Sequence, residues 1–168
     1  MLDKTEDTLR ALGLMTLGSR LKRLGERLQA EVQPILGELS PPVPAGQHPL
    51  LAALSRHGAV TVGELAALLG VAQPGVTRAV GQLAALGLVT VATTVEDGRR
   101  RLVSLTLQGE AFVAAARVGV WRRVEEAVAD LCAGFGEELL AHLASIEDGL
   151  AARPLATRDG ESGRDDTT

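Results

Sequence analysis

Residues 96–106, EDGRRRLVSLT, contain a cluster of arginines and are the part of the chain whose residue types point most clearly to binding chemistry. Arg99, Arg100 and Arg101 follow two acids and a glycine, and an alternating apolar run comes after them. Guanidinium groups bind phosphate and carboxylate oxygens through charge-assisted hydrogen bonds. The glycine suits a turn between β-branched segments at 88–95 and 102–107, which predicts a hairpin with a basic tip. The alternative is that these arginines are only a solvated surface.

The positive charge of the chain is concentrated around this hairpin. The 168 residues contain 17 Lys and Arg against 21 Asp and Glu, so the net charge is −4. Residues 48–109 contain five arginines and three acids, which gives this segment +2 and leaves −6 for the remainder. The overall balance argues against a protein that coats nucleic acid indiscriminately, whereas the central segment could bind an anionic partner.

Short helices with distinct boundary signals precede the hairpin. The sequence predicts a helix over residues 50–57 and a second helix that stops at Gly70. Thr61 and Glu64 have the spacing of a capping box at the start of that second helix. A third helix is predicted over residues 73–85. Two short helices joined by a tight turn form a helix-turn-helix, and its second helix can enter a DNA major groove.

The third helix carries groups suited to reading DNA. Val76, Val80 and Leu83 give it one apolar face, and its polar residues face elsewhere. Arginine can pair bidentately with guanine and glutamine with adenine, and proline is tolerated in the first turn of a helix. The candidate DNA contacts are Thr61, Gln73, Pro74, Thr77, Arg78 and Gln82 in the helix-turn-helix, and Asp97, Arg99, Arg100 and Arg101 in the hairpin.

A helix-turn-helix followed by a hairpin resembles the winged helix of the MarR (multiple antibiotic resistance regulator) family. The residues that carry the resemblance are 63–89 and 97–106, in which an Asp, an Arg two residues later and a closing Leu-Thr match the family's wing pattern. The resemblance implies a mainly α fold with a small β-hairpin, flanked by N- and C-terminal dimerisation helices. It also implies that Arg99 enters a minor groove and that Asp97 holds the wing tip. Arg100 and Arg101 are then expected to contact phosphates.

The third helix departs from this family at its start and in its composition. Ala72 stands where relatives usually have a capping serine, and the loss of a cap costs about 1 kcal/mol. Gly75 and Gly81 each cost about as much again relative to alanine. Gly81 could allow a close approach of backbone to phosphate, or it could lie under a neighbouring helix. Packing of the apolar face must therefore stabilise this helix.

The expected organisation has four parts. Residues 5–47 form an N-terminal dimerisation helix and linker, 48–109 the DNA-binding lobe, 110–152 C-terminal dimerisation helices, and 153–168 a disordered polar tail. Pro34 is expected to break or kink the N-terminal helix. The apolar stripes outside the lobe exceed what its core can cover, which predicts a homodimer. An intramolecular helical bundle is the alternative.

Enzymatic and metal chemistry find little support in the sequence. His48, His57 and His142 are far apart and lack partners at zinc-ligand spacing, and no nucleophile or phosphate-loop motif is present. Cys132 allows no internal disulfide and is expected to be a buried thiol. No segment is long and apolar enough for a membrane span. We therefore expect no catalytic residues, no metal, no cofactor, no membrane partner and a cytoplasmic location.

These features together predict a sequence-specific transcriptional regulator, a repressor that binds double-stranded DNA as a homodimer on a pseudo-palindromic site. The resemblance also implies release of DNA by a small-molecule effector, although aromatic residues make up only 2% of the chain and disfavour a stacking pocket. The alternative is a winged helix that contacts other proteins without binding DNA. The operator, the target genes and the effector cannot be read from the sequence.

Overall fold

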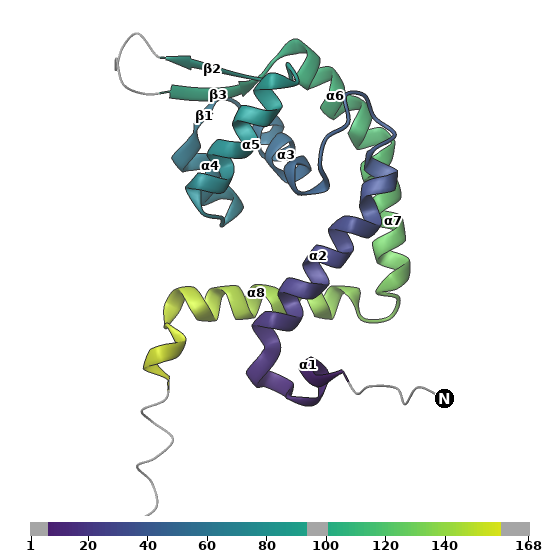
Figure 1. Ribbon diagram of the computed structural model, residues 1–168, viewed down its shortest axis with the longest axis vertical. Helices are drawn as coiled ribbons and strands as arrows, with labels where there is room; N and C mark the ends of the chain where they lie inside the picture. Colours follow the sequence, from purple (N-terminus) through teal and green to yellow (C-terminus); the bar gives the residue numbers. More distant parts are fainter. Residues whose placement is uncertain (1–6, 94–100, 159–168) are drawn as a thin grey trace, which may run out of the picture. The chain divides into compact units, whose positions relative to one another are not determined.

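The computed structural model describes residues 7–93 and 101–158 and is mainly helical, with one small antiparallel sheet (Figure 1). It divides into two compact units, Met1–Val124 and Glu125–Thr168. The helices and strands are α1 Thr8–Ala11, α2 Leu17–Leu36, α3 His48–His57, β1 Val60–Thr61, α4 Val62–Leu69, α5 Gln73–Ala85, β2 Val89–Thr93, β3 Arg101–Leu105, α6 Leu107–Val118, α7 Val120–Leu131 and α8 Gly136–Ala152, with 3₁₀ helices at Gly13–Thr16, Ala45–Gln47 and Leu155–Thr157.

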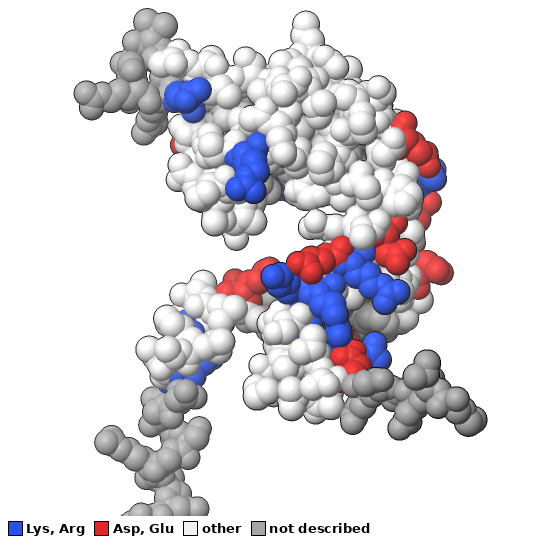
Figure 2. Space-filling model, viewed as in Figure 1, with Lys and Arg blue, Asp and Glu red and all other residues white. Residues whose placement is uncertain are grey.

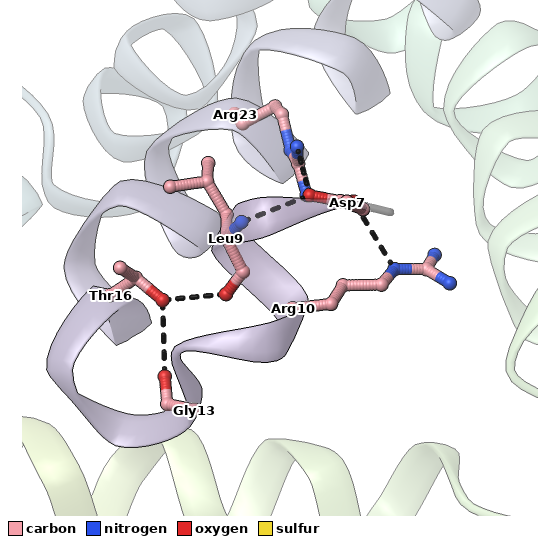
Figure 3. Close-up of polar contacts among 6 residues, drawn as sticks. All are labelled: Asp7, Leu9, Arg10, Gly13, Thr16 and Arg23. Carbon is pink, nitrogen blue, oxygen red and sulfur yellow. Dashed lines mark hydrogen bonds and ion pairs between the residues drawn. The ribbon is translucent and has the colours of Figure 1, made fainter. Parts of the chain in front are cut away.

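The N-terminal segment forms two helices, α1 and α2. Gly13 has a φ of +60°, and a 3₁₀ turn separates the two helices. The Thr16 hydroxyl donates to the carbonyls of Leu9 (2.6 Å) and Gly13 (3.1 Å), which closes this turn (Figure 3). The carboxylate of Asp7 accepts two hydrogen bonds from Arg23, at 3.1 and 2.8 Å, and this pair holds α1 against α2.

Of the two effects expected of Pro34, a break or a kink in the N-terminal helix, the break does not occur. Helix α2 continues through Pro34 and ends at Leu36, where the Gly37 amide donates to the carbonyl of Gln33 at 2.8 Å. Proline removes one amide donor from the i→i−4 ladder. Because Pro34 lies in the last turn, the rest of α2 keeps its hydrogen bonds.

The helix-turn-helix predicted from local signals is confirmed. The Glu64 amide donates to Thr61 Oγ1 (3.2 Å), and the Thr61 amide donates to the Glu64 carboxylate (2.7 Å), so the capping box at α4 is complete. Gly70 ends α4 in the left-handed conformation, with φ +64°. Helix α5 spans 73–85 as predicted, and Ala72 supplies no side-chain cap.

The predicted hairpin is part of a three-stranded sheet in the order β1-β3-β2. Strands β2 and β3 pair antiparallel from Val89 opposite Leu105 to Thr93 opposite Arg101. Strand β1 was not predicted, because two residues are too few to show an alternating pattern. It pairs on the other edge of β3, with Val60 opposite Val103.

One apolar core joins α3, α4, α5 and the sheet, and it positions α5. The apolar face predicted for α5 is confirmed, since Val76, Val80 and Leu83 are at most 5% exposed. The largest fully buried side chains are Val43, Leu51, Leu54, Leu65, Leu83, Leu88 and Val103. This burial stabilises a helix that its two glycines and missing cap would leave unstable alone.

The segment after β3 forms two helices, α6 and α7. Thr106 caps α6, and its Oγ1 accepts from the Gly109 amide at 3.0 Å. Gly119 ends α6 with φ −112° and ψ −97°, a backbone conformation outside the helical region. The helical spacing of apolar residues continues across this break, so it does not mark where α6 ends.

The second unit contains the rest of α7 and helix α8. Residues of α8 are exposed or half-buried within the unit, among them Leu140 and Leu150, at 69% and 48% exposed. Cys132 is half-buried rather than buried as expected. The 3₁₀ helix Leu155–Thr157 lies in the segment predicted to be disordered. None of the described helices has the length and apolarity needed to cross a membrane.

Candidate nucleic-acid interface

The outward face of α5 presents the side chains that are predicted to contact DNA. Gln73, Pro74, Thr77, Arg78 and Gln82 are all exposed, while the opposite face of the helix is packed into the core. At 3.6 residues per turn, Arg78 lies on the side away from Val76 and Val80. The guanidinium of Arg78 is therefore available for binding at the middle of the exposed face of α5.

A groove of about 640 Å³ joins α5 to the wing. Four of the predicted contacts line it: Thr61 at the start of α4, Gln73 and Thr77 on α5, and Arg101 at the start of β3. Gly81 lines the same groove. The fold thus brings together residues 40 positions apart in the chain, because α5 packs against β2 and β2 pairs with β3.

The tip of the wing lies in residues 94–100, outside the described residues. Asp97, Arg99 and Arg100 belong to that segment, and their roles stay predictions. Arg101 is the first described residue beyond it, is exposed, and stands opposite Thr93 in the β2–β3 register. The wing therefore starts beside the groove.

Two of the predicted DNA contacts, Thr61 and Thr77, make hydrogen bonds within the protein through their hydroxyl groups. Thr61 is half-buried, and its Oγ1 both accepts from the Glu64 amide and donates to the Glu64 carboxylate at 2.9 Å. The Thr77 hydroxyl donates to the carbonyl of Gln73 at 3.1 Å. Each hydroxyl keeps acceptor capacity, but Thr61 serves first to fix the start of α4.

Gln82 forms a hydrogen bond with a residue that was not among the predicted interface residues. Gln47 is only 8% exposed, and its Nε2 donates a hydrogen bond to Oε1 of Gln82. No local signal marks Gln47, because its partner lies 35 residues away. The exposed amide of Gln82 is therefore oriented by a buried one.

Gly81 is open on its side-chain position. A Cβ built there would meet nothing within 4 Å, apart from its own helix backbone and chain neighbours, so Gly81 does not lie under a neighbouring helix of this chain. No neighbouring helix among the described residues covers Gly81, and the close approach of its backbone to phosphate stays a prediction.

The surface around α5 carries little negative charge. In the described part of residues 48–109 the charged side chains are Arg56, Arg78, Arg101 and Glu64. Glu64 is the acid of the capping box. Figure 2 shows separate basic patches over α4 and α5 and beside the ends of the strands, on a face that is otherwise largely uncharged.

A metal site is not formed by the described residues, since no three His, Cys, Asp or Glu side chains lie close enough to share an ion. His48 is 5% exposed and contacts Trp121 instead. Burial lowers the pKa of its imidazole below the ordinary value, although a weak bond to the Val43 carbonyl opposes this effect. The ring is thus a structural element of the first unit.

Comparison with known proteins relates the helix-turn-helix region to a protein family. The MarR family profile matches residues 39–100. Two uncharacterized HTH-type transcriptional regulators are similar to this chain, one from Mycobacterium bovis (41% identity over 78 residues) and one from Mycobacterium leprae (40% over 76 residues). These matches cover 46% and 45% of this chain, and the chain spans about half the length of these relatives, 54% and 53%.

Solved structures share the fold over most of the chain. A mutant MarR from E. coli complexed with operator DNA has a TM-score of 0.66 at 22% identity, covering 77% of this chain and 91% of that one. A MarR family transcriptional regulator from Silicibacter pomeroyi has a TM-score of 0.59 at 27% identity, covering 81% and 88%. BpsR of Bordetella bronchiseptica, whose DNA binding is regulated by 6-hydroxynicotinic acid, has a TM-score of 0.64 at 21% identity, covering 82% and 94%. With its capped helix-turn-helix and wing strands, this chain has the winged helix-turn-helix fold of the MarR family, whose profile matches residues 39–100, and its sequence is similar to those of HTH-type transcriptional regulators.

Proposed function

We propose that this protein is a DNA-binding transcriptional regulator that inserts α5 into a major groove and places its wing along the neighbouring minor groove. The observation that carries this proposal is the groove between α5 and β3, where Gln73, Thr77 and Arg101 converge. A duplex seated there would meet amide and hydroxyl groups on its base edges and guanidinium groups on its phosphates. Arg99 and Arg100 would extend the same contacts from the wing tip.

We further propose that the protein acts as a homodimer on a pseudo-palindromic site, and as a repressor. Helix α2 exposes Leu21 and Leu24, at 37% and 50%, beside more exposed apolar residues in the turn that precedes it. The helix of the second unit, α8, exposes a further apolar surface. A two-fold interface that buries both would set two recognition helices about 34 Å apart, one turn of DNA.

A small-molecule effector could bind an apolar pocket of about 300 Å³ in the first unit. It is lined by Val32, Leu36, Ala45, His48, Pro49, Ala52, Trp121 and Val124. This size is at the lower end for ligand sites. The pocket adjoins the start of α3, so an occupant could displace the helix-turn-helix. The relation to BpsR supports this part of the proposal only through the shared fold.

The competing function is a winged helix that contacts proteins. That function would favour an apolar or acidic recognition face, whereas α5 presents Arg78 and polar side chains. Binding to a mixed pool of duplex DNA over a range of salt concentrations separates the two functions. We expect retention that weakens steeply as salt rises, because phosphate contacts release counterions. Retention without salt dependence, or none at low salt, would favour the protein-contact function.

A further inference from the structure

The buried amide of Gln47 contacts an exposed amide on the recognition helix. Gln47 ends the 3₁₀ helix Ala45–Gln47, and its Nε2 donates to Oε1 of Gln82. Gln47 is 8% exposed, while Gln82 is exposed on α5. One member of the pair is thus held inside the first unit, and the other faces outward.

The buried surroundings of Gln47 favour this orientation of its amide. Its Oε1 is buried and has no hydrogen-bond partner among the described residues. Turning the amide over would place the NH₂ group, with two donors, at that position. Unpaired buried N–H groups are rarer than carbonyl oxygens with unused lone pairs. Gln47 therefore directs its donor to Gln82, and the Oε1 atom of Gln82 is turned toward Gln47, where one of its two lone pairs accepts this bond.

The position of Gln82 on α5 makes this restriction relevant to DNA. Gln82 follows Arg78 by four residues, so the two side chains are neighbours on the same side of the helix. Arg78 points away from the core, and both residues are exposed. A duplex that contacts Arg78 would therefore pass beside Gln82.

A glutamine whose oxygen is held toward the protein reads bases differently from a free one. Free glutamine pairs with adenine by accepting from N6 and donating to N7. A glutamine that presents its NH₂ group outward matches guanine, which presents two acceptors, N7 and O6. We propose that Gln47 is a positioning residue that holds the oxygen of Gln82 inward and its NH₂ group outward, and so makes α5 prefer guanine over adenine at one base pair of each half-site. This inference rests on the proposed DNA binding through α5.

The test is selection of bound sequences from a pool of short duplexes with a fully randomised centre. The full chain is compared with Gln47→Met, Gln82→Ala and the double variant. Methionine keeps the unbranched shape of Gln47 but cannot donate, so the Gln82 amide can turn freely. We expect the guanine-to-adenine ratio at one base pair to fall about fivefold or more in Gln47→Met, and the preference at that base pair to disappear in Gln82→Ala.

The double variant separates positioning from a general structural effect. If Gln47 acts through Gln82, Gln47→Met should change no base preference in the Gln82→Ala background. Melting temperatures check that the variants fold, and Gln47→Leu replaces Gln47→Met if that variant does not. An unchanged ratio in Gln47→Met, or a shift that persists without Gln82, would overturn the inference while DNA binding stands. Wild-type protein that selects no duplex sequence would overturn the proposed function as well.

Discussion

The indole N–H of Trp121 donates a 2.8 Å hydrogen bond to Nδ1 of His48. This bond joins the start of α7 to the first residue of α3, and the two rings meet edge to face with centroids 6.1 Å apart. Nε2 of His48 lies 3.4 Å from the carbonyl oxygen of Val43. Because Nδ1 accepts, the ring is neutral and carries its proton on Nε2.

This arrangement predicts a stability that falls in mild acid. Burial lowers the pKa of His48 in the folded state, whereas the unfolded side chain titrates near its ordinary value of about 6.5. Below that pH the unfolded state binds more protons, so the free energy of unfolding falls until the pH passes the folded pKa. Urea unfolding between about pH 8 and pH 5 measures this slope.

The variant His48→Gln is the control for the pH effect. It should be less stable than the wild type at every pH, but it should lose the part of the slope that begins near the ordinary histidine pKa. His57 and His142 are exposed and remain in both proteins, so they cancel in the comparison. Equal slopes in the two proteins would show that His48 does not titrate differently on folding.

Two glycines should respond to alanine in opposite directions. A Cβ at Gly109 would lie 2.0 Å from the carbonyl oxygen of Leu88, so Gly109→Ala should destabilise the fold by about 1–3 kcal/mol or more. Gly81 has open space, and Gly81→Ala should stabilise α5 by about 0.5–1 kcal/mol. Thermal unfolding measures both changes. A stabilised Gly81→Ala that binds DNA more weakly would support a close backbone approach at this position.

Arg78 should contribute to DNA affinity without contributing to the fold. It is exposed at the middle of α5, and an arginine–guanine pair is worth about 1–3 kcal/mol. Arg78→Ala should weaken binding by that amount in a gel-shift titration. Arg117→Ala is the matched control, because Arg117 lies on α6 and donates to Ser55 at 3.3 Å. Equal losses in the two variants would remove Arg78 from the recognition surface.

The wing arginines should determine the salt dependence of binding. Arg101 is exposed at the start of β3, and Arg99, two residues before it, is predicted to lie at the tip of the wing. Each phosphate contact removed should lower the slope of log affinity against log salt by about one. Arg101→Ala should show this change, and Arg99→Ala should cause the larger loss of affinity if it enters the minor groove. Titrations at three or more salt concentrations measure both, and unaltered binding of Arg99→Ala would exclude that role.

Charges placed on the apolar side of α2 should disrupt the homodimer. Leu21 and Leu24 are exposed in the single chain, so Leu21→Glu and Leu24→Glu should leave the fold intact and yield monomers. Light scattering after size-exclusion chromatography measures the mass. Lys22→Glu, on the same turn, controls for the added charge, since Lys22 is exposed and makes only a long 4.0 Å pair with Glu26. Dimers in both leucine variants would place the interface elsewhere.

The sequence by itself determined the helix-turn-helix and the general nature of its surface. The capping box of Thr61 and Glu64, the helix end at Gly70 and the apolar face of α5 are signals within a few residues, and the structure confirms each of them. Their physical basis is local: a cap satisfies amides one turn away, and a 3.6-residue period decides which side of a helix is buried. The exposed polar face of α5 follows from the same period.

Only the tertiary structure decided which distant residues meet. Strand β1 forms because it can pair with an edge of β3. The groove exists because the fold brings Arg101 beside α5. The hydrogen-bond partners of Gln82 and His48 lie 35 and 73 residues away in the sequence, so no local pattern predicts them. A hydrogen bond between remote segments depends on how the core packs them, and that packing is a property of the folded chain as a whole.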